Sequence, residues 1–204
     1  MSGSAYDPGT DGAKMQFKDA MSYGDYLHLD GLLSKQHPIS AAHDELLFII
    51  QHQVAELWMK LVAHEIEAAM RMLEADRPGK AVKHLARVKE VQKQLYAQWS
   101  VLETMTPSEY AEFRSVFGRA SGFQSPQYRH RGGLLGQRNR RMLAVYEHLP
   151  EWHARLSDAI ESPGLYDVFL RYLSRQGHAI PAHALERDFT DTRAVDADVV
   201  AVLR

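Results

Sequence analysis

The feature that most constrains the fold is a long segment whose apolar residues recur with the period of an α-helix. Leucine, isoleucine, valine and methionine return every three or four positions between 41 and 75. This spacing predicts one long amphipathic helix over Ala41–Ala75. We expect Ser40 to cap its start and Pro78-Gly79 to end it.

A second segment, Lys80–Glu103, repeats this spacing, so the two segments are predicted to form an antiparallel helical hairpin. Thr106-Pro107-Ser108-Glu109 then predicts a new helix, because Thr106 and Glu109 fit a capping box and proline suits the first turn. A loop is expected over 118–126, with helical character returning near Leu134.

The last third of the chain is also predicted to be helical. Met142–Tyr146 has helical character, and Ser162-Pro163 indicates a further helix start. Asp196 or Asp198 then fits the cap of a helix that runs into the last residue without a stop signal, which indicates a chain cut within an element. No strand-like alternation is present, so we predict an all-α bundle of long antiparallel helices.

Composition excludes several classes of function. A net charge of -2 disfavours nucleic-acid partners, and the absence of cysteine excludes thiolate metal sites and disulfides. The most apolar run, Leu46–Ile50, is too short to cross a membrane, and 1–12 lacks the apolar core of a signal peptide. We therefore expect a cytoplasmic protein without a membrane partner, made of a flexible arm over 1–19 and one domain over 20–204.

His52 is the first candidate for chemistry. It shares a helix face with Phe48 and Glu56, one turn away on either side. A histidine there suits hydrogen bonding to a ligand, proton transfer or metal binding. The alternative is a histidine at the edge of the core whose nitrogens are satisfied by neighbours. No histidine follows a glutamate by three positions, which disfavours a di-iron bundle site.

Tyr110 and Arg114 form a second candidate site. They lie one turn apart, and a guanidinium beside a phenol suits a small carboxylate. The alternative is a solvated arginine next to a packed tyrosine. Ser121-Gly122 offers a hydroxyl and backbone amides nearby. Together these residues predict an amino-acid-sized site with an aromatic wall.

Longer motifs carry a more specific signal over most of the chain beyond the arm. They are Tyr23-Gly24-x-Tyr26-Leu27, His43-Asp44-Glu45, Leu47–Gln53, Glu56-Leu57-Trp58, Gln98–Thr104, Thr106-Pro107-x-Glu109-Tyr110, Phe113-Arg114, Ser121–Ser125, Phe169–Leu173 and Gly177–Pro181. In this order, they resemble the N-terminal part of the tryptophan 2,3-dioxygenase family.

The resemblance implies an all-helical, homotetrameric enzyme that uses haem b and its iron. Such an enzyme inserts both atoms of O2 across the indole C2–C3 bond of L-tryptophan and gives N-formylkynurenine, the first step of tryptophan degradation through the kynurenine pathway. The family's proximal iron-ligating histidine is expected beyond Arg204, so no metal ligand is assigned within this chain. The alternatives are a related haem oxygenase acting on a modified tryptophan or indole, or a catalytically silent helical fragment or interaction protein without haem.

The resemblance also implies roles for single residues. His52 matches the histidine that hydrogen-bonds the indole N–H, and Phe48 matches the residue that packs on the indole. Arg114 and Tyr110 match the pair that holds the substrate carboxylate. The other positions implied to contact substrate are Ile49, Ile50, Gln51, Phe117 and Ser121, with Tyr23, Tyr26 and Leu27 closing the pocket of a neighbouring subunit.

Two places depart from the family's pattern. Arg119 stands where the family usually has proline. His130-Arg131-Gly132-Gly133 stands where an apolar, acidic and aromatic stretch is expected. Both lie near the expected substrate loop, so they are candidates for altering substrate choice or assembly.

Overall fold

The computed structural model describes residues 20–190 and 196–203, and its contacts divide the chain into two compact units, Met1–Ile39 and Ser40–Arg204. Within the described residues every regular element is an α- or 3-10 helix, which confirms the all-α class. The predicted arm over 1–19 lies outside the described residues. A single domain over 20–204 remains a prediction.

The first unit contains two short helices, α1 (Tyr23–Leu27) and α2 (Leu29–Leu33). Ser22 caps α1 in a capping box with Asp25, in which each side chain bonds the other's backbone N–H. His28 joins the helices with a positive φ of 51°, a left-handed conformation that ends α1. The side chains of Tyr23 and Tyr26 are 75% and 71% exposed.

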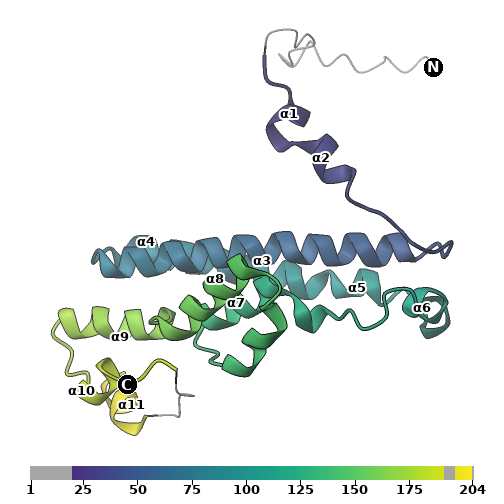
Figure 1. Cartoon of the computed structure of the whole chain (residues 1–204). Helices are drawn as coiled ribbons and strands as arrows, with labels where there is room; N and C mark the ends of the chain where they lie inside the picture. The colour runs from purple at the N-terminus through teal and green to yellow at the C-terminus, as the bar shows by residue number, and fades with distance from the viewer. Residues whose placement is uncertain (1–19, 191–195, 204) are drawn as a thin grey trace. The chain divides into compact units, whose positions relative to one another are not determined.

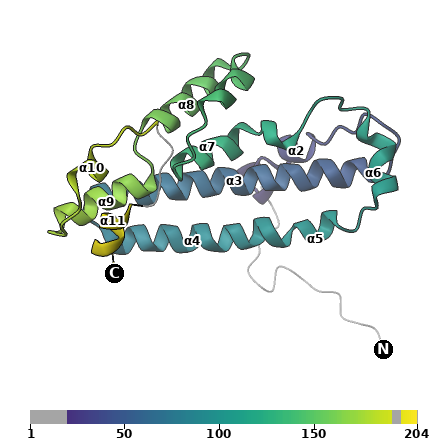
Figure 2. The ribbon, with the colours of Figure 1, turned by 90° about the horizontal axis from the view of Figure 1, so that it is seen from below.

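The second unit is built on the hairpin of α3 (Glu45–Glu74) and α4 (Pro78–Ala97), which confirms the predicted antiparallel pair (Figure 1). Val62 and Ile66 are fully buried and share a core cluster with residues of α4. Figure 2 shows α3 lying between α4 on one side and α7 on the other. The long central helix therefore supports the elements on both of its sides.

The start of α3 differs from the predicted one. The helix begins at Glu45, four residues after the expected Ala41, and Asp44 occupies the cap position. The backbone N–H and the hydroxyl of Ser40 both donate to the carboxylate of Glu45. The Ser40 hydroxyl also accepts from the backbone N–H of Ala42. These bonds hold a turn ahead of the helix, and the segment between Ser40 and Glu45 is non-helical.

The second predicted helix is divided in two. Helix α4 ends at Ala97, and α5 (Trp99–Leu102) follows after Gln98. The predicted capping box is confirmed at α6 (Pro107–Arg114), where Thr106 accepts from the backbone N–H of Glu109 and its own backbone N–H donates to the Glu109 carboxylate.

The segment that the sequence left unassigned, 129–133, belongs to α7 (Pro126–Leu134), which follows the 3-10 helix η2 (Gly122–Gln124). Gly133 allows a close approach to α8 (Pro150–Glu161), since a Cβ there would lie only 3.0 Å from the Cβ of Ala159. Helix α8 has no counterpart among the predicted helices. The expected helical character near Met142 is the 3-10 helix η3 (Arg140–Tyr146).

The C-terminal part of the described chain contains α9 (Leu165–Arg175), α10 (Ala182–Leu185) and α11 (Ala197–Val202). Leu170 and Val199 are both buried in the cluster that joins these helices. The predicted cap of the last helix is confirmed, with Asp196 accepting from two backbone N–H groups of its first turn.

Helix α3 is the one described helix whose length and average hydropathy meet the criteria for a candidate membrane span. The apolar run Leu46–Ile50 predicted no membrane span, because Gln51, His52 and Gln53 follow it directly. In the fold, α3 packs against α4, α7 and α9. These contacts bury only 17% of the apolar window, and Leu46, Ile50 and Leu57 of the same helix are exposed.

A buried carboxylate links the two arms of the hairpin. Glu65 of α3 accepts from Arg87 of α4 at 2.6 Å and lies 2.7 Å from Nδ1 of His84. Burial by itself raises the pKa of Glu65, but the hydrogen bonds from His84 and Arg87 outweigh it, and the net effect lowers the pKa from its ordinary 4.5. The folded state therefore stabilises the ionised carboxylate.

We predict that Glu65→Gln lowers the free energy of unfolding at pH 7 by about 1–3 kcal/mol, because two donors lose a charged acceptor. A carboxylate with a lowered pKa contributes stability above its unfolded-state pKa and loses that contribution as pH falls through the folded-state pKa. In urea titrations, the gap between wild type and Glu65→Gln should thus be full at pH 6–7 and shrink below about pH 4.5. Glu90→Gln, which removes an exposed pair with Lys93, is the control and should change stability by less than about 0.5 kcal/mol. A gap that is absent at pH 7 would contradict the prediction.

Candidate functional site

The second unit contains a cavity of about 870 Å³. Its volume falls in the range of about 300–1,000 Å³ that is typical of small-molecule sites. The wall is mostly apolar, and it is built from the first half of α3, the end of α4 with α5, and the chain from α6 to α7. The lining residues that the following paragraphs use are Phe48, His52, Glu56, Met59, Gln98, Trp99, Tyr110, Arg114, Phe117, Ser121, Phe123, Tyr128 and Arg131.

Aromatic rings form one end of this cavity. Phe48 stacks on Phe117 with ring centroids 5.4 Å apart, and Tyr110 lies 5.9 Å from Phe48. Phe113 is fully buried behind them and meets Phe48 edge-on at 5.6 Å. Tyr110 and Phe113 of α6, together with Phe117 in the turn after it, thereby pack against Phe48 of α3. Phe48, Tyr110 and Phe117 therefore form an aromatic part of the cavity wall.

His52 lies on the cavity wall one helical turn after Phe48. Its Nδ1 is 2.7 Å from the backbone carbonyl oxygen of Phe48, and the two rings are 4.1 Å apart. Because a carbonyl oxygen only accepts, Nδ1 carries the proton in this bond. In the neutral ring Nε2 is then the acceptor, so His52 is set to receive a hydrogen bond from an N–H group.

Arg114 lies at the same end of the cavity as the aromatic rings. One of its terminal nitrogens donates to the carbonyl oxygen of Gly118 at 2.8 Å, and its guanidinium lies 4.8 Å from the centre of the Phe117 ring. These two contacts restrain the side chain and leave further N–H groups for a ligand. Tyr110 lines the cavity one turn earlier on α6, so both side chains can reach one carboxylate.

Ser121 completes this group on the loop after α6. Its hydroxyl accepts from the backbone N–H of Phe123 at 3.3 Å and caps η2, while its own N–H donates to Gln124. The structure thus gathers six of the predicted residues around one cavity. These are Phe48, His52, Tyr110, Arg114, Phe117 and Ser121.

The other predicted positions do not line the cavity. Ile49, Ile50 and Gln51 lie on other faces of α3, because consecutive helical residues point in different directions. Gln51 is buried, and its side-chain amide donates to the backbone carbonyl of Gln98 at 2.6 Å. It therefore holds α5 against α3 instead of facing a ligand. Tyr23, Tyr26 and Leu27 belong to the first unit.

Several lining residues were not predicted as site residues. The side-chain oxygen of Gln98 is buried and has no hydrogen-bond partner among the described residues, which leaves an acceptor for a ligand. Tyr128 and Arg131 line the cavity from α7, with the Arg131 guanidinium 5.0 Å from the Tyr128 ring centre. Of these three residues, Gln98 alone belongs to the motifs quoted above. Glu56 and Phe123, which also line the cavity, belong to others of those motifs.

The two departures from the family's pattern have different surroundings. Arg119 is exposed and does not line the cavity. His130 is buried and accepts at Nε2 from Arg155, with Glu67 3.7 Å away. Burial and the charge of Arg155 lower the pKa of His130, so the ring is neutral near pH 7. His130 therefore acts in packing, whereas its neighbour Arg131 faces the cavity.

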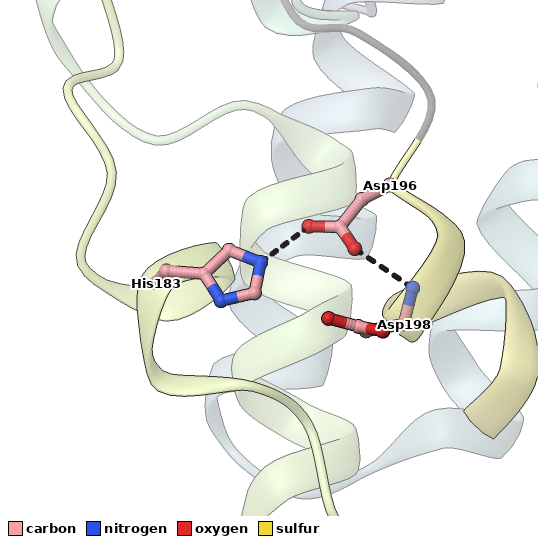
Figure 3. A group of neighbouring side chains, drawn as sticks. All are labelled: His183, Asp196 and Asp198. Carbon is pink, nitrogen blue, oxygen red and sulfur yellow. Dashed lines mark hydrogen bonds and ion pairs between the residues drawn. The ribbon is translucent and has the colours of Figure 1, made fainter.

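Figure 3 shows a second group of ionisable side chains, His183, Asp196 and Asp198. Nε2 of His183 lies 2.7 Å from the carboxylate of Asp196, which also caps α11. Helix capping and one exposed ion pair account for this arrangement. It lies in the α10–α11 region and takes no part in the cavity.

Comparison with known proteins decides the family. The family model described as tryptophan 2,3-dioxygenase matches residues 8–159. The chain belongs to the tryptophan 2,3-dioxygenase family. A protein named tryptophan 2,3-dioxygenase from Kineococcus radiotolerans is 52% identical over 95% of the chain and 68% of its own length. One of the same name from Bradyrhizobium sp. strain ORS 278 is 54% identical over 98% of the chain and 72% of its own length.

The match to the family model covers the complete cavity wall, from Phe48 to Arg131. The relatives also match the chain beyond residue 159, where α9 packs on α3. The resemblance inferred from short motifs is thereby confirmed over most of the chain.

We predict that Phe113→Ala lowers the free energy of unfolding by about 3–5 kcal/mol, because it leaves a void under the aromatic end of this family member's cavity. Phe123→Ala is the matched control. Phe123 also lines the cavity but is 74% exposed, so this substitution should alter the free energy of unfolding by no more than about 0.5 kcal/mol. Chemical denaturation measures both. Equal losses for the two variants would show that Phe113 has no special part in this packing.

Proposed function

We propose that the chain carries the substrate site of a tryptophan 2,3-dioxygenase, which cleaves the indole C2–C3 bond of L-tryptophan with O2 to give N-formylkynurenine. One observation carries the proposal. A histidine with a defined acceptor nitrogen, an aromatic surface and an arginine–tyrosine pair line one cavity of a chain in this family. The direct test measures L-tryptophan binding to the haem-loaded protein and formation of N-formylkynurenine from it, and the absence of both would overturn the proposal.

The side chains suggest how L-tryptophan is held. Arg114 and Tyr110 bind the carboxylate through charge-assisted hydrogen bonds. Phe48 and Phe117 pack against the indole ring, and Nε2 of His52 accepts from the indole N–H. Each interaction restricts a different part of the substrate, so the C2–C3 bond is kept in one position relative to the rest of the cavity.

The cavity fits haem as the cofactor that the family implies. Its walls are mainly apolar, with Met59 and Trp99 among them, as a porphyrin face requires. A cationic side chain, Arg131, and the unpartnered oxygen of Gln98 provide polar contacts at the wall. Within the described residues His52 is the only histidine lining the cavity, and it is assigned here to the substrate.

When bound, the haem iron supplies the activation of O2. The residues of the chain supply position and exclusion of water. The half-buried Phe48 and Phe117 cover the indole and keep water from the reacting carbons. His52 holds the indole proton in a hydrogen bond at Nε2 and need not remove it. A carboxylate clamp favours free amino acids over indole itself.

Assembly and location are part of the same proposal. We propose a homotetramer in the cytoplasm, in which the α1 segment of one subunit closes the pocket of its neighbour. The exposure of Tyr23 and Tyr26 supports this, since large aromatic side chains left in water favour association. Leu27 of the same helix is also exposed.

We predict that Arg114→Gln lowers kcat/KM for L-tryptophan by about 10- to 100-fold, because it removes a charge-assisted hydrogen bond of about 1.5–3 kcal/mol. Tryptamine, which lacks the carboxylate, should be turned over equally by variant and wild type. Arg119→Gln, next to the cavity but outside its wall, serves as the control and should leave both substrates unaffected. A loss on tryptamine as large as that on L-tryptophan would argue against the clamp.

We predict that His52→Leu, which removes the acceptor at similar size, lowers kcat/KM for L-tryptophan by about 2- to 10-fold. With 1-methyl-L-tryptophan, whose indole nitrogen cannot donate, the variant should equal or exceed the wild type. Steady-state kinetics on both substrates test this. The same loss on both would mean that His52 acts otherwise than through the indole N–H.

A further inference from the structure

Arg131 is a cation in the cavity wall that the proposed reaction leaves unused. Its Nε is buried without a hydrogen-bond partner among the described residues. It takes part in none of the ion pairs found there. Its guanidinium lies 5.0 Å from the centre of the Tyr128 ring. A guanidinium so placed still has donors to offer to an anion.

The contacts of α7 place Arg131 far from Arg114. Gln127, one turn before Arg131, donates to Glu56 of α3, and Leu134, one turn after it, packs in the cluster of Val62 and Ile66. Arg131 therefore lies beside α3 near Met59, which also lines the cavity.

Arg114 is placed near Phe48, since it stacks on Phe117 and Phe117 stacks on Phe48. Phe48 and Met59 are eleven residues apart on α3, which corresponds to about 16 Å along the helix axis. An amino-acid carboxylate held by Arg114 is thus out of reach of Arg131. The cavity wall therefore has one cationic side chain near Phe48 and another near Met59, where Glu56 also lines it.

We infer that Arg131 binds a carboxylate of the cofactor, a haem propionate, at the Met59 end of the cavity. The inference rests on the proposed function, because that function supplies the carboxylate-bearing occupant. The residue belongs to His130-Arg131-Gly132-Gly133, which stands where the resemblance leads us to expect an apolar, acidic and aromatic stretch. An arginine there can form a charge-assisted hydrogen bond to the edge of the cofactor.

The test compares haemin with haemin dimethyl ester, which has the same ring but no propionate charge. Both are titrated into the whole protein as wild type, Arg131→Met and Arg119→Met, and binding is followed by the haem absorbance band and by quenching of tryptophan fluorescence. Trp99 lines the cavity, so the fluorescence reports on occupancy without any need for turnover. L-Tryptophan binding is measured on the same variants.

We expect Arg131→Met to weaken haemin binding about tenfold. Its affinity for the dimethyl ester and for L-tryptophan should stay within about twofold of the wild-type values, and Arg119→Met should match the wild type throughout. Arg131→Lys retains the charge and should recover part of the haemin affinity. The Arg131→Lys variant is also a control for misfolding of Arg131→Met. Circular dichroism and thermal denaturation of each protein check the fold directly.

Three results would overturn the inference. Equal haemin affinity of wild type and Arg131→Met would overturn it alone. A loss confined to L-tryptophan would assign Arg131 to the substrate carboxylate instead. A wild-type protein that binds neither haemin nor L-tryptophan would overturn the proposed function together with the inference.

Discussion

The packing of α3 against α4 supports everything else in the second unit, and it does so unevenly along the helix. The later half of α3 is the buried part, with Val62 and Ile66 fully enclosed by α4 and α7. The earlier half lines the cavity with Phe48 and His52, which remain half-buried. Because both halves belong to one rigid helix, the free energy gained in the core holds the site residues in place.

The polar groups of the second unit follow the same division. In the core, carboxylates are paired, as Glu65 is with Arg87 and Asp167 is with Arg187. In the cavity wall, Arg131 and the side-chain oxygen of Gln98 have buried atoms without partners in the described chain. Unpartnered buried polar atoms cost stability, and a ligand in the cavity can supply the missing bonds of these two. Two further buried atoms without partners, Nε of Arg129 and Nε of Arg138, lie outside the cavity wall.

Local rules account for the elements that were predicted correctly. The capping box at Thr106 and the cap at Asp196 depend on side chains two or three residues from the amides they bond. The errors arose where a competing contact decided the outcome. Ser40 bonds the Glu45 carboxylate and α3 begins later than predicted. Residues 129–133, for which no element was predicted, continue α7, and there Gly133 allows the close approach to Ala159 of α8.

By itself the sequence determined the hairpin and the spacing of residues within each helix, such as Phe48 with His52 and Tyr110 with Arg114. These follow from the 3.6-residue turn, a local property of the backbone. Only the tertiary structure decided that α6 and α7 meet α3 around one cavity, and that Arg131 faces it. These tertiary contacts join residues that are far apart in the chain. They depend on the combined packing of many side chains, and no short segment of the sequence contains that information.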